Sequence, residues 1–272
     1  MNAIETLLND TSKRFILIAG PCVVESKSLC FEVASELKKV CDQLRIKLIF
    51  KGSFVKANRT RYSSFRTIGI EEALEILSQV REHFDIPVVT DIHETHEAEL
   101  AAKYVDIIQI PAFLSRQTFL IEAAAKTGKP INLKKGEFMT TETLKFQVEK
   151  VKHTNPNATV LLTERGVSFG RNDIVIDFRE VTKLKEEPFP SYSIVDCSHS
   201  VQRVNLEKGI SMGDYRDTYT LAKASIAVGA DGVFIETHPN PNIALSDSAS
   251  MMPLNEMPNL LEKLVKIWDV AH

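Results

Sequence analysis

The segment RFILIAG at residues 14–20, followed by Pro21 and Cys22, decides the fold that this sequence predicts. It is a short run of apolar and β-branched residues, which is typical of a strand buried on both faces in a parallel sheet. A Gly-Pro pair ends such a strand and begins a loop. We therefore expect the thiol of Cys22 to face a cleft and not the core.

Seven more runs of this kind follow, at 47–53, 87–92, 106–112, 130–136, 159–164, 192–198 and 232–238. Amphipathic stretches separate them, at 28–43, 71–84, 95–103, 117–127, 140–152, 216–228 and 255–268. Eight strands alternating with helices favour a closed (β/α)8 (TIM) barrel over an open doubly wound sheet, and no GxGxxG follows the first strand. We predict one α/β barrel domain over residues 1–272, with an extra short strand within 174–178.

The composition excludes several classes of protein. The chain has 272 residues, is 44% hydrophobic and carries a formal charge of -3, so neither nucleic acid nor a membrane surface is expected as a partner. The N-terminal segment lacks the basic start and apolar core of a secretion signal. Cysteines 22, 30, 41 and 197 form no CxxC pair, which indicates reduced thiols in a cytoplasmic enzyme.

The predicted strands end in polar side chains. In a (β/α)8 barrel the carboxyl ends of all strands meet at one rim, where the active sites of this fold lie. Solvated loops alone would explain some of this polarity, but not why lysines and metal-binding types gather at the same end. The side chains in question are Cys22, Lys51, Ser53, Asp91, His93, Gln109, Lys134, Lys135, Glu164, Arg165, Asp196, His199, Glu236 and His238.

The densest polar segment is KGSFVKANRT at residues 51–60. Lysines, an arginine, an asparagine and two hydroxyls form a surface rich in donors for phosphate and carboxylate groups. The alternative is a solvated basic loop. Because the segment directly follows an apolar strand, and therefore opens into the rim, an anion-binding site is the favoured interpretation.

Four candidate metal ligands come at or just beyond strand ends: Cys22, His199, Glu236 and Asp247. A thiolate, an imidazole and two carboxylates suit a divalent transition-metal ion. The alternative for a single buried cysteine is a small hydrophobic packing residue. Because thiolate and imidazole ligands must be deprotonated, metal affinity should fall at low pH.

Eight motifs make the chain recognisable: AGPC, KGSFVKANRT, TDIH, QIPAFLSRQT, LKKG, TERG, DCSHSVQ and IETHPNP. In this order, over roughly residues 15 to 255, the sequence resembles the 3-deoxy-D-manno-octulosonate-8-phosphate synthases. The resemblance implies a homotetrameric barrel that condenses phosphoenolpyruvate with D-arabinose 5-phosphate and water. The products would be the eight-carbon sugar acid phosphate and inorganic phosphate, in a cytoplasmic pathway toward the lipopolysaccharide inner core.

The resemblance also implies roles for individual residues. Lys51, Ser53 and Lys56 match contacts to the phosphoenolpyruvate carboxylate, while Lys134 and Arg165, with the backbone near Ala112, match those to its phosphate. The arabinose phosphate site corresponds to Asn58, Arg59 and Thr60, together with Arg116 from a neighbouring subunit. Polar residues lining the same cavity correspond to Asp91, Gln109 and Gln202.

The residue after Gly-Pro divides this family into two classes. Members with Asn at that position work without metal, and members with Cys need a divalent ion. Cys22 therefore implies the metal-dependent class, with His199, Glu236 and Asp247 as the other ligands and Mn²⁺, Fe²⁺ or Zn²⁺ as the ion. The ion would position the aldehyde and polarise it or a nearby water.

Two loops depart from the family pattern. Residues 209–218 read GISMGDYRDT where many relatives have Gly-Gly-Arg in a loop over the site, and Ser248 follows Asp247 where Gly is usual. Glycine often supplies backbone freedom, so the geometry around Asp247, closure over the site and acceptor specificity are the properties these changes would affect.

Two other functions compete with this interpretation. A 3-deoxy-D-arabino-heptulosonate-7-phosphate synthase would use erythrose 4-phosphate as acceptor, but typically has Lys-Pro-Arg-Thr where this chain has an additional Asn58. A non-catalytic barrel that binds phosphosugars is the other alternative. The retained Lys51, Lys134, Arg165 and His199 argue against it.

Overall fold

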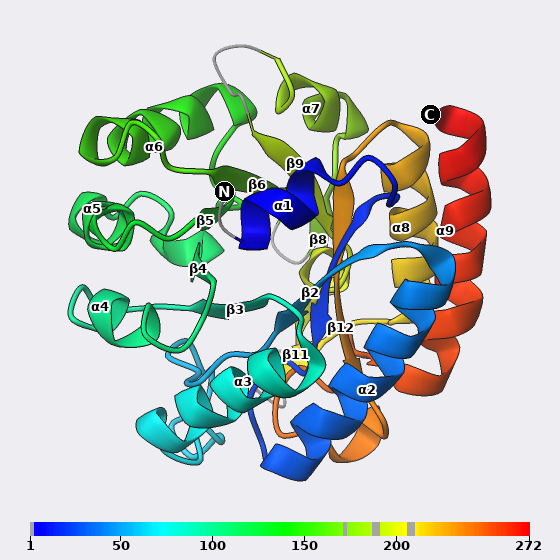
Figure 1. Cartoon of the computed structure of the whole chain (residues 1–272), viewed down its shortest axis with the longest axis horizontal. Helices are drawn as coiled ribbons and strands as arrows, with labels where there is room; N and C mark the ends of the chain where they lie inside the picture. The colour runs from blue at the N-terminus through cyan, green and yellow to red at the C-terminus, as the bar shows by residue number, and fades with distance from the viewer. Residues whose placement is uncertain (1–2, 171–172, 187–190, 206–209) are drawn as a thin grey trace.

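The computed structural model describes residues 3–170, 173–186, 191–205 and 210–272. Within these residues, eight parallel strands pair in sequence order, and the last pairs with the first to close a barrel (Figure 1). The predicted (β/α)8 barrel is therefore confirmed. The strands are β1 (Ile16–Gly20), β2 (Lys47–Lys51), β3 (Val88–Asp91), β4 (Ile107–Ile110), β5 (Ile131–Lys134), β6 (Val160–Glu164), β9 (Tyr192–Asp196) and β12 (Gly232–His238).

Helices surround the strands, as Figure 1 shows. Those that the sequence predicts are α2 (Lys27–Leu44), α3 (Ile70–Phe84), α4 (Glu97–Ala101), α5 (Thr118–Lys126), α6 (Thr141–Thr154), α8 (Arg216–Ala227) and α9 (Met257–Ala271). Two short helices, α1 (Ala3–Asn9) and α7 (Phe178–Lys183), were not predicted. The 3₁₀ turns are η1 (Ala112–Leu114), η2 (His199–Val201), η3 (Pro241–Ile243) and η4 (Leu254–Glu256).

Helix α2 illustrates how local sequence sets an element. Ser26 caps its start by accepting a hydrogen bond from the backbone N–H of Leu29 at 3.2 Å. Its buried face carries Cys30 and Cys41 among aliphatic residues, so these two thiols pack in the core. The helix ends where Arg45 adopts a left-handed conformation, with φ of 55°.

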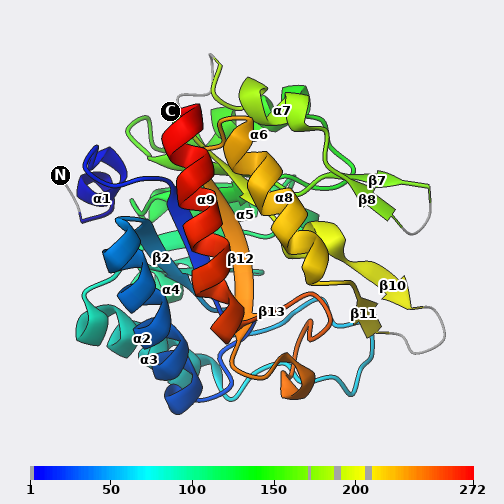
Figure 2. The same ribbon diagram turned by 90° about the vertical axis from the view of Figure 1, so that its right-hand side faces the viewer.

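Two hairpins interrupt the regular alternation: β7 (Val167–Phe169) with β8 (Asp173–Val175), and β10 (Arg203–Asn205) with β11 (Ile210–Met212). They project beyond α8 in Figure 2. The extra strand predicted within 174–178 thus ends at Val175. The reason is a helix cap, because the Asp177 side chain accepts from the N–H of Arg179 at 3.0 Å and starts α7. The short β13 (Met252–Pro253) pairs with β12.

The core has two parts. Side chains on the outside of the barrel pack against the helices, whereas a smaller cluster includes Ile16, Ile49 and Phe234 from the strands and Ile4 and Leu8 from α1. Helix α1 lies at the amino ends of the strands, since Lys47, at the start of β2, donates to the Leu8 carbonyl at 2.7 Å. The opposite end of the barrel is left for the polar residues.

No helix in the described part of the chain combines the length and the apolar content that crossing a membrane requires.

Candidate active site

A cavity of about 620 Å³ lies at the carboxyl ends of the strands. The structure brings most of the predicted substrate-binding residues to its wall. Because parallel strands present their carboxyl ends at one rim, residues far apart in sequence meet there. The predicted residues that line it are Lys51, Lys56, Asn58, Arg59, Thr60, Asp91, Gln109, Ala112, Lys134, Arg165, His199, Gln202 and Asp247.

Four predicted residues are not among the described residues that line the cavity. Ser53, Cys22 and Glu236 are buried behind its wall, with 1% exposure or less. The prediction that the Cys22 thiol faces a cleft is wrong in that the side chain is fully buried and does not line the cavity, but the thiol contacts Asp247, which does. Arg116 is exposed on the segment after η1.

Lys51, which lines the cavity, forms a buried ion pair with Glu236 behind it. Their strands, β2 and β12, lie on either side of β1, and Nζ lies 2.8 Å from Oε1. Lys51 also donates to the Cys22 carbonyl at 2.9 Å and to Ser53 Oγ at 3.1 Å. Burial disfavours the charged form of Glu236, but the cations of Lys51 and Lys56 outweigh it and lower its pKa.

Gly20 is required by this arrangement. It ends β1 between the two charged strands, and a Cβ atom there would overlap the carbonyl oxygen of Lys51. The Gly-Pro-Cys sequence therefore does more than end a strand, since it lets the backbones of β1 and β2 approach closely beside the ion pair.

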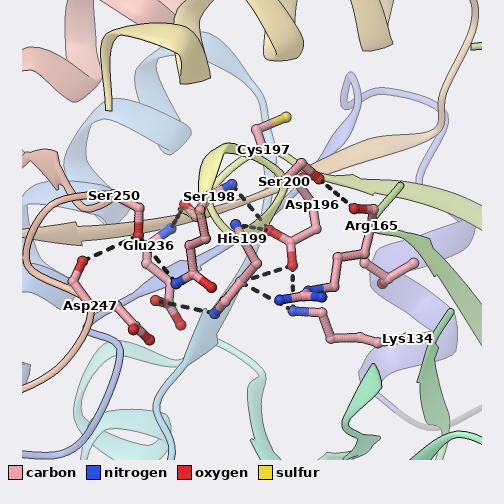
Figure 3. A network of polar contacts seen from close by, with 12 residues as sticks. Lys134, Arg165, Asp196, Cys197, Ser198, His199, Ser200, Glu236, Asp247 and Ser250 are labelled. Atoms are coloured by element: carbon pink, nitrogen blue, oxygen red, sulfur yellow. Dashed lines mark hydrogen bonds and ion pairs between the residues drawn. The ribbon is translucent and has the colours of Figure 1, made fainter. Parts of the chain in front are cut away.

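Asp196 connects His199 and Lys134, as Figure 3 shows. Its Oδ2 lies 2.9 Å from His199 Nδ1 and forms an ion pair with Lys134, while Oδ1 accepts from the backbone N–H groups of Ser198 and His199. Burial opposes ionisation of Asp196, but the hydrogen bonds with His199 and Lys134 and the charge of Lys134 hold its pKa well below the usual value. The lysine is oriented toward the cavity by this carboxylate.

Three of the four predicted metal ligands form a compact group. One ligand atom each from Cys22, Glu236 and Asp247 lie within 4.8 Å of one another. His199 lies at the edge of this group, with Nε2 3.6 Å from Glu236 Oε2. The Cys22 thiol lies 3.1 Å from Asp247 Oδ2.

The chemistry of these donors fits a divalent transition ion. Glu236 Oε2 is buried and has no hydrogen-bond partner among the described residues, so an acceptor is free for a cation. Burial raises the pKa of the Cys22 thiol well above its usual value, and the carboxylates of Asp247 and Glu236 raise it further. A cation held by those carboxylates would reverse the effect and favour the thiolate. Metal binding itself stays a prediction.

Arg165 follows β6 and extends into the cavity. Its guanidinium lies over the Phe113 ring, 5.4 Å from the ring centre, and forms an ion pair with Glu137. Both Phe113 and Glu137 line the cavity, and the sequence analysis missed both. Glu137 directly follows the LKKG motif at the end of β5, so its position in the sequence offered a signal for it.

Asp91 and His93 form a second charged group at the cavity wall. Asp91 Oδ2 lies 3.2 Å from His93 Nε2, and Glu97 Oε2 lies 3.6 Å from His93 Nδ1. Burial disfavours the imidazolium, but the two carboxylates outweigh it and raise the pKa of His93 to about 9. Asp91 Oδ1 has no hydrogen-bond partner among the described residues, and is available to a substrate hydroxyl.

The loop around Asp247 accommodates the change from the family pattern. Asp247 itself adopts a left-handed conformation, with φ of 47°, whereas Ser248 is not among the described residues with positive φ. A serine therefore fits at 248 without strain. Arg59 donates to Ser246 Oγ at 2.5 Å and so joins this loop to the 51–60 segment. In the other altered loop, residue 209 lies outside the described residues, and α8 begins at Arg216.

The fold and the site together define a (β/α)8 barrel with a cation-lined cavity for small anionic molecules. A family model described as the DAHP synthetase I family matches residues 3–270, and the chain belongs to this family.

Curated relatives share more than 40% of their residues with this chain. The 2-dehydro-3-deoxyphosphooctonate aldolase of Fusobacterium nucleatum is 44% identical over 255 residues, which cover 94% of this chain and 91% of the relative. The protein of the same name from Agrobacterium fabrum is 46% identical over 255 residues, covering 93% and 89%. That from Mesorhizobium japonicum is 46% identical over 264 residues, covering 96% and 94%.

Proposed function

We propose that this protein is a 3-deoxy-D-manno-octulosonate-8-phosphate synthase of the metal-dependent class. It condenses phosphoenolpyruvate with D-arabinose 5-phosphate and water, and yields 3-deoxy-D-manno-octulosonate 8-phosphate and inorganic phosphate. The observation that carries the proposal is one cavity whose wall combines five cations with residues of six separate motifs. Relatives named for this product match nearly the whole chain.

The phosphoenolpyruvate site is assigned to the side of the cavity formed by β2, β5 and β6. Lys51 and Lys56 would bind the carboxylate, and Ser53 holds the Lys51 ammonium in place at 3.1 Å. Lys134 and Arg165 would bind the phosphate, with the backbone near Ala112 assisting. These cations are at most 7% exposed, so their attraction for an anion is little screened by water.

The pentose phosphate site is assigned to the 58–60 segment. Asn58, Arg59 and Thr60 line the cavity and would bind the acceptor phosphate. Asp91, Gln109 and Gln202 would bind its hydroxyl groups, since each presents polar atoms to the same space. The cavity is large enough for two small phosphorylated molecules side by side.

The chemistry requires two strongly anionic substrates to approach each other. Fixed cations offset their repulsion and hold C3 of the enol against the aldehyde carbon, which reduces the entropic part of the barrier. Water adds at C2, and the C2–O bond to phosphate breaks, so no nucleophilic side chain and no ATP is needed. The protein therefore contributes mainly orientation and charge compensation.

Cys22, His199, Glu236 and Asp247 would hold one divalent metal ion, Mn²⁺, Fe²⁺ or Zn²⁺. When bound, such an ion supplies a Lewis acid that polarises an oxygen of the aldehyde or of a nearby water. Because His199 Nδ1 is hydrogen-bonded to Asp196, Nε2, which lies on the side of Glu236, would be the nitrogen that binds the metal ion. His199 thus reaches the metal group and, through Asp196, the lysine assigned to phosphate.

We further propose a homotetramer in which Arg116 reaches the acceptor phosphate of a neighbouring subunit. Arg116 is exposed, and large exposed apolar side chains lie on the elements around it: Phe113, Phe119, Phe138 and Phe146 are 49%, 78%, 57% and 50% exposed. Apolar groups of this kind favour protein contact. A fully active monomer would contradict this part of the proposal.

We place the enzyme in the cytoplasm, in the synthesis of lipopolysaccharide precursors. The four cysteines are free and buried, which is the state expected in a reducing compartment. The proposed product is an eight-carbon sugar acid phosphate, which agrees with the phosphooctonate in the name of the relatives. We assign it as a precursor of lipopolysaccharide.

A phosphate-release assay with purified protein tests the proposal. We expect turnover with phosphoenolpyruvate and arabinose 5-phosphate that stops with a chelator and returns with Mn²⁺, Fe²⁺ or Zn²⁺. Turnover only with erythrose 4-phosphate would assign the activity that gives the family its name. Binding of both substrates without turnover would indicate a phosphosugar-binding barrel.

The variant Cys22→Asn sharpens the metal assignment. An asparagine amide can donate to Asp247 as the thiol does at 3.1 Å, so we expect partial turnover that no longer responds to chelator. Metal content, measured by mass spectrometry, should fall in this variant and stay unchanged in Cys41→Ala, which removes a buried thiol on α2. Complete loss of turnover in a folded Cys22→Asn protein would instead give the ion a direct chemical role.

A further inference from the structure

Three cations of the cavity wall have acidic partners, and one of these partners differs from the others. Lys51 pairs with Glu236, Lys134 with Asp196, and Arg165 with Glu137. In the first two pairs the acids are 1% and 0% exposed. Glu137 is 22% exposed, while its partner Arg165 is 7% exposed.

The position of each acid in the fold explains the difference. Glu236 and Asp196 belong to the strands β12 and β9, and separating them from their lysines would leave a fully buried carboxylate without its lysine cation. Glu137 lies in the segment between β5 and α6, outside the strands. Its backbone carbonyl accepts from Ser168 at 3.0 Å, so the main chain is held while the carboxylate can turn toward solvent.

We propose that Glu137 is a displaceable counterion of Arg165 that limits the affinity of the site for phosphate. The inference rests on the proposed function, which assigns Arg165 to the phosphate of phosphoenolpyruvate. The Glu137 carboxylate binds the guanidinium where a phosphate oxygen would bind. Phosphate binding therefore exchanges one anion for another and does not simply add an ion pair.

This exchange affects both the binding of the substrate phosphate and the release of inorganic phosphate. An acid that lines the cavity repels a bound phosphate through the low-dielectric interior, and Glu137 lines it together with Arg165 and Lys134. Inorganic phosphate, which is a product, would otherwise be held by two buried cations. When it leaves, Glu137 returns to Arg165, and the buried guanidinium is never left without an anion.

The test is the binding of inorganic phosphate, measured by titration calorimetry. In Glu137→Gln we expect phosphate to bind about threefold to fivefold more tightly than in the unaltered protein, because one competing charge is removed. Glu137→Ala should change affinity in the same direction. The KM for phosphoenolpyruvate should fall in both variants. The matched control is Glu142→Gln, which removes a 62% exposed carboxylate at the start of α6 that pairs with Lys183 and does not line the cavity among the described residues.

A double-mutant cycle separates the possible outcomes. If Arg165→Ala weakens phosphate binding and abolishes the effect of Glu137→Gln, the inference holds. If Arg165→Ala weakens binding but Glu137→Gln leaves it unchanged or weaker in the presence of Arg165, then Glu137 merely orients the arginine and the inference is wrong. If Arg165→Ala does not affect phosphate, the assignment of Arg165 in the proposed function is wrong, and the inference fails with it.

Discussion

The two ends of this barrel bury their residues for different reasons. At the amino ends of the strands, Ile4 and Leu8 of α1 belong to an apolar cluster with Ile16 and Ile107, the first residues of β1 and β4. At the carboxyl ends the buried residues are charged, as in the pair of Lys51 with Glu236. Apolar burial stabilises a fold, whereas the desolvation of charges offsets much of what their pairing contributes.

The difference teaches where stability and activity reside. The apolar end holds the strands together, and the charged end carries groups that a folded barrel does not need. Variants at the two ends should therefore differ in kind: changes at the carboxyl rim should lower activity at nearly constant stability, and changes at the amino end should do the reverse.

The largest effect is expected from Lys134→Ala. This change removes a cation assigned to the phosphate, and kcat/KM in the phosphate-release assay should fall about 10²- to 10³-fold. The free energy of unfolding should fall by less than in a core truncation, because Asp196 loses its lysine but keeps His199 and two backbone N–H groups as partners. Urea unfolding measures the free energy of unfolding. Lys39→Ala, on the exposed face of α2, is the control and should affect neither.

The opposite pattern is expected from Leu8→Ala at the amino end. Leu8 is 3% exposed within the apolar cluster, and its truncation leaves a cavity that should lower the free energy of unfolding by about 2–5 kcal/mol. At a temperature where the variant is folded, kcat and KM should stay within twofold of the unaltered values. Val270→Ala removes apolar atoms from a side chain that is 90% exposed on α9, and should leave stability unchanged.

A loss of activity in folded Leu8→Ala as large as that of Lys134→Ala would break the comparison. It would mean that packing at the amino end sets the geometry of the rim, although the two lie at opposite ends of the strands.

The barrel was largely predictable because each strand is a short apolar run, and eight such runs with helices between them leave few alternatives. Helix α1 was missed. Its seven residues are too few to form a stable helix alone, and it depends on packing of Ile4 and Leu8 against the strands. The β7–β8 hairpin was anticipated only in part, since its exposed residues give no clear apolar period.

The site was predictable where a residue is the last one of a strand. Lys51, Lys134 and Asp91 lie at such ends, and the topology alone brings them to one rim. The burial of Cys22 and the contact of Glu137 with Arg165 could not be read from the sequence. Both depend on how the connecting segments fold over the rim, which no short-range pattern encodes.

The smallest expected effect is the pH dependence of stability that His93, a residue at the rim, contributes. His93 lies between Asp91, at 3.2 Å, and Glu97, at 3.6 Å, and these carboxylates raise its pKa to about 9 against the opposing effect of burial. In the unfolded chain its pKa is about 6.5. The folded state therefore binds the proton more tightly, and the stabilisation is fully present below about pH 6.5, declines as pH rises, and is lost above about pH 9.

Urea unfolding between pH 6 and pH 9.5 measures this contribution, which should be on the order of 1–3 kcal/mol. Lys51 and Lys56 also face Asp91 and hold its pKa well below the usual value, so its carboxylate stays ionised over this range and the slope is due to the imidazole. His93→Gln should remove the decline in stability, and an NMR titration of the ring should give the raised pKa directly. Equal pH dependence in the variant and the unaltered protein would contradict the prediction. His93 would then add nothing to stability over this pH range.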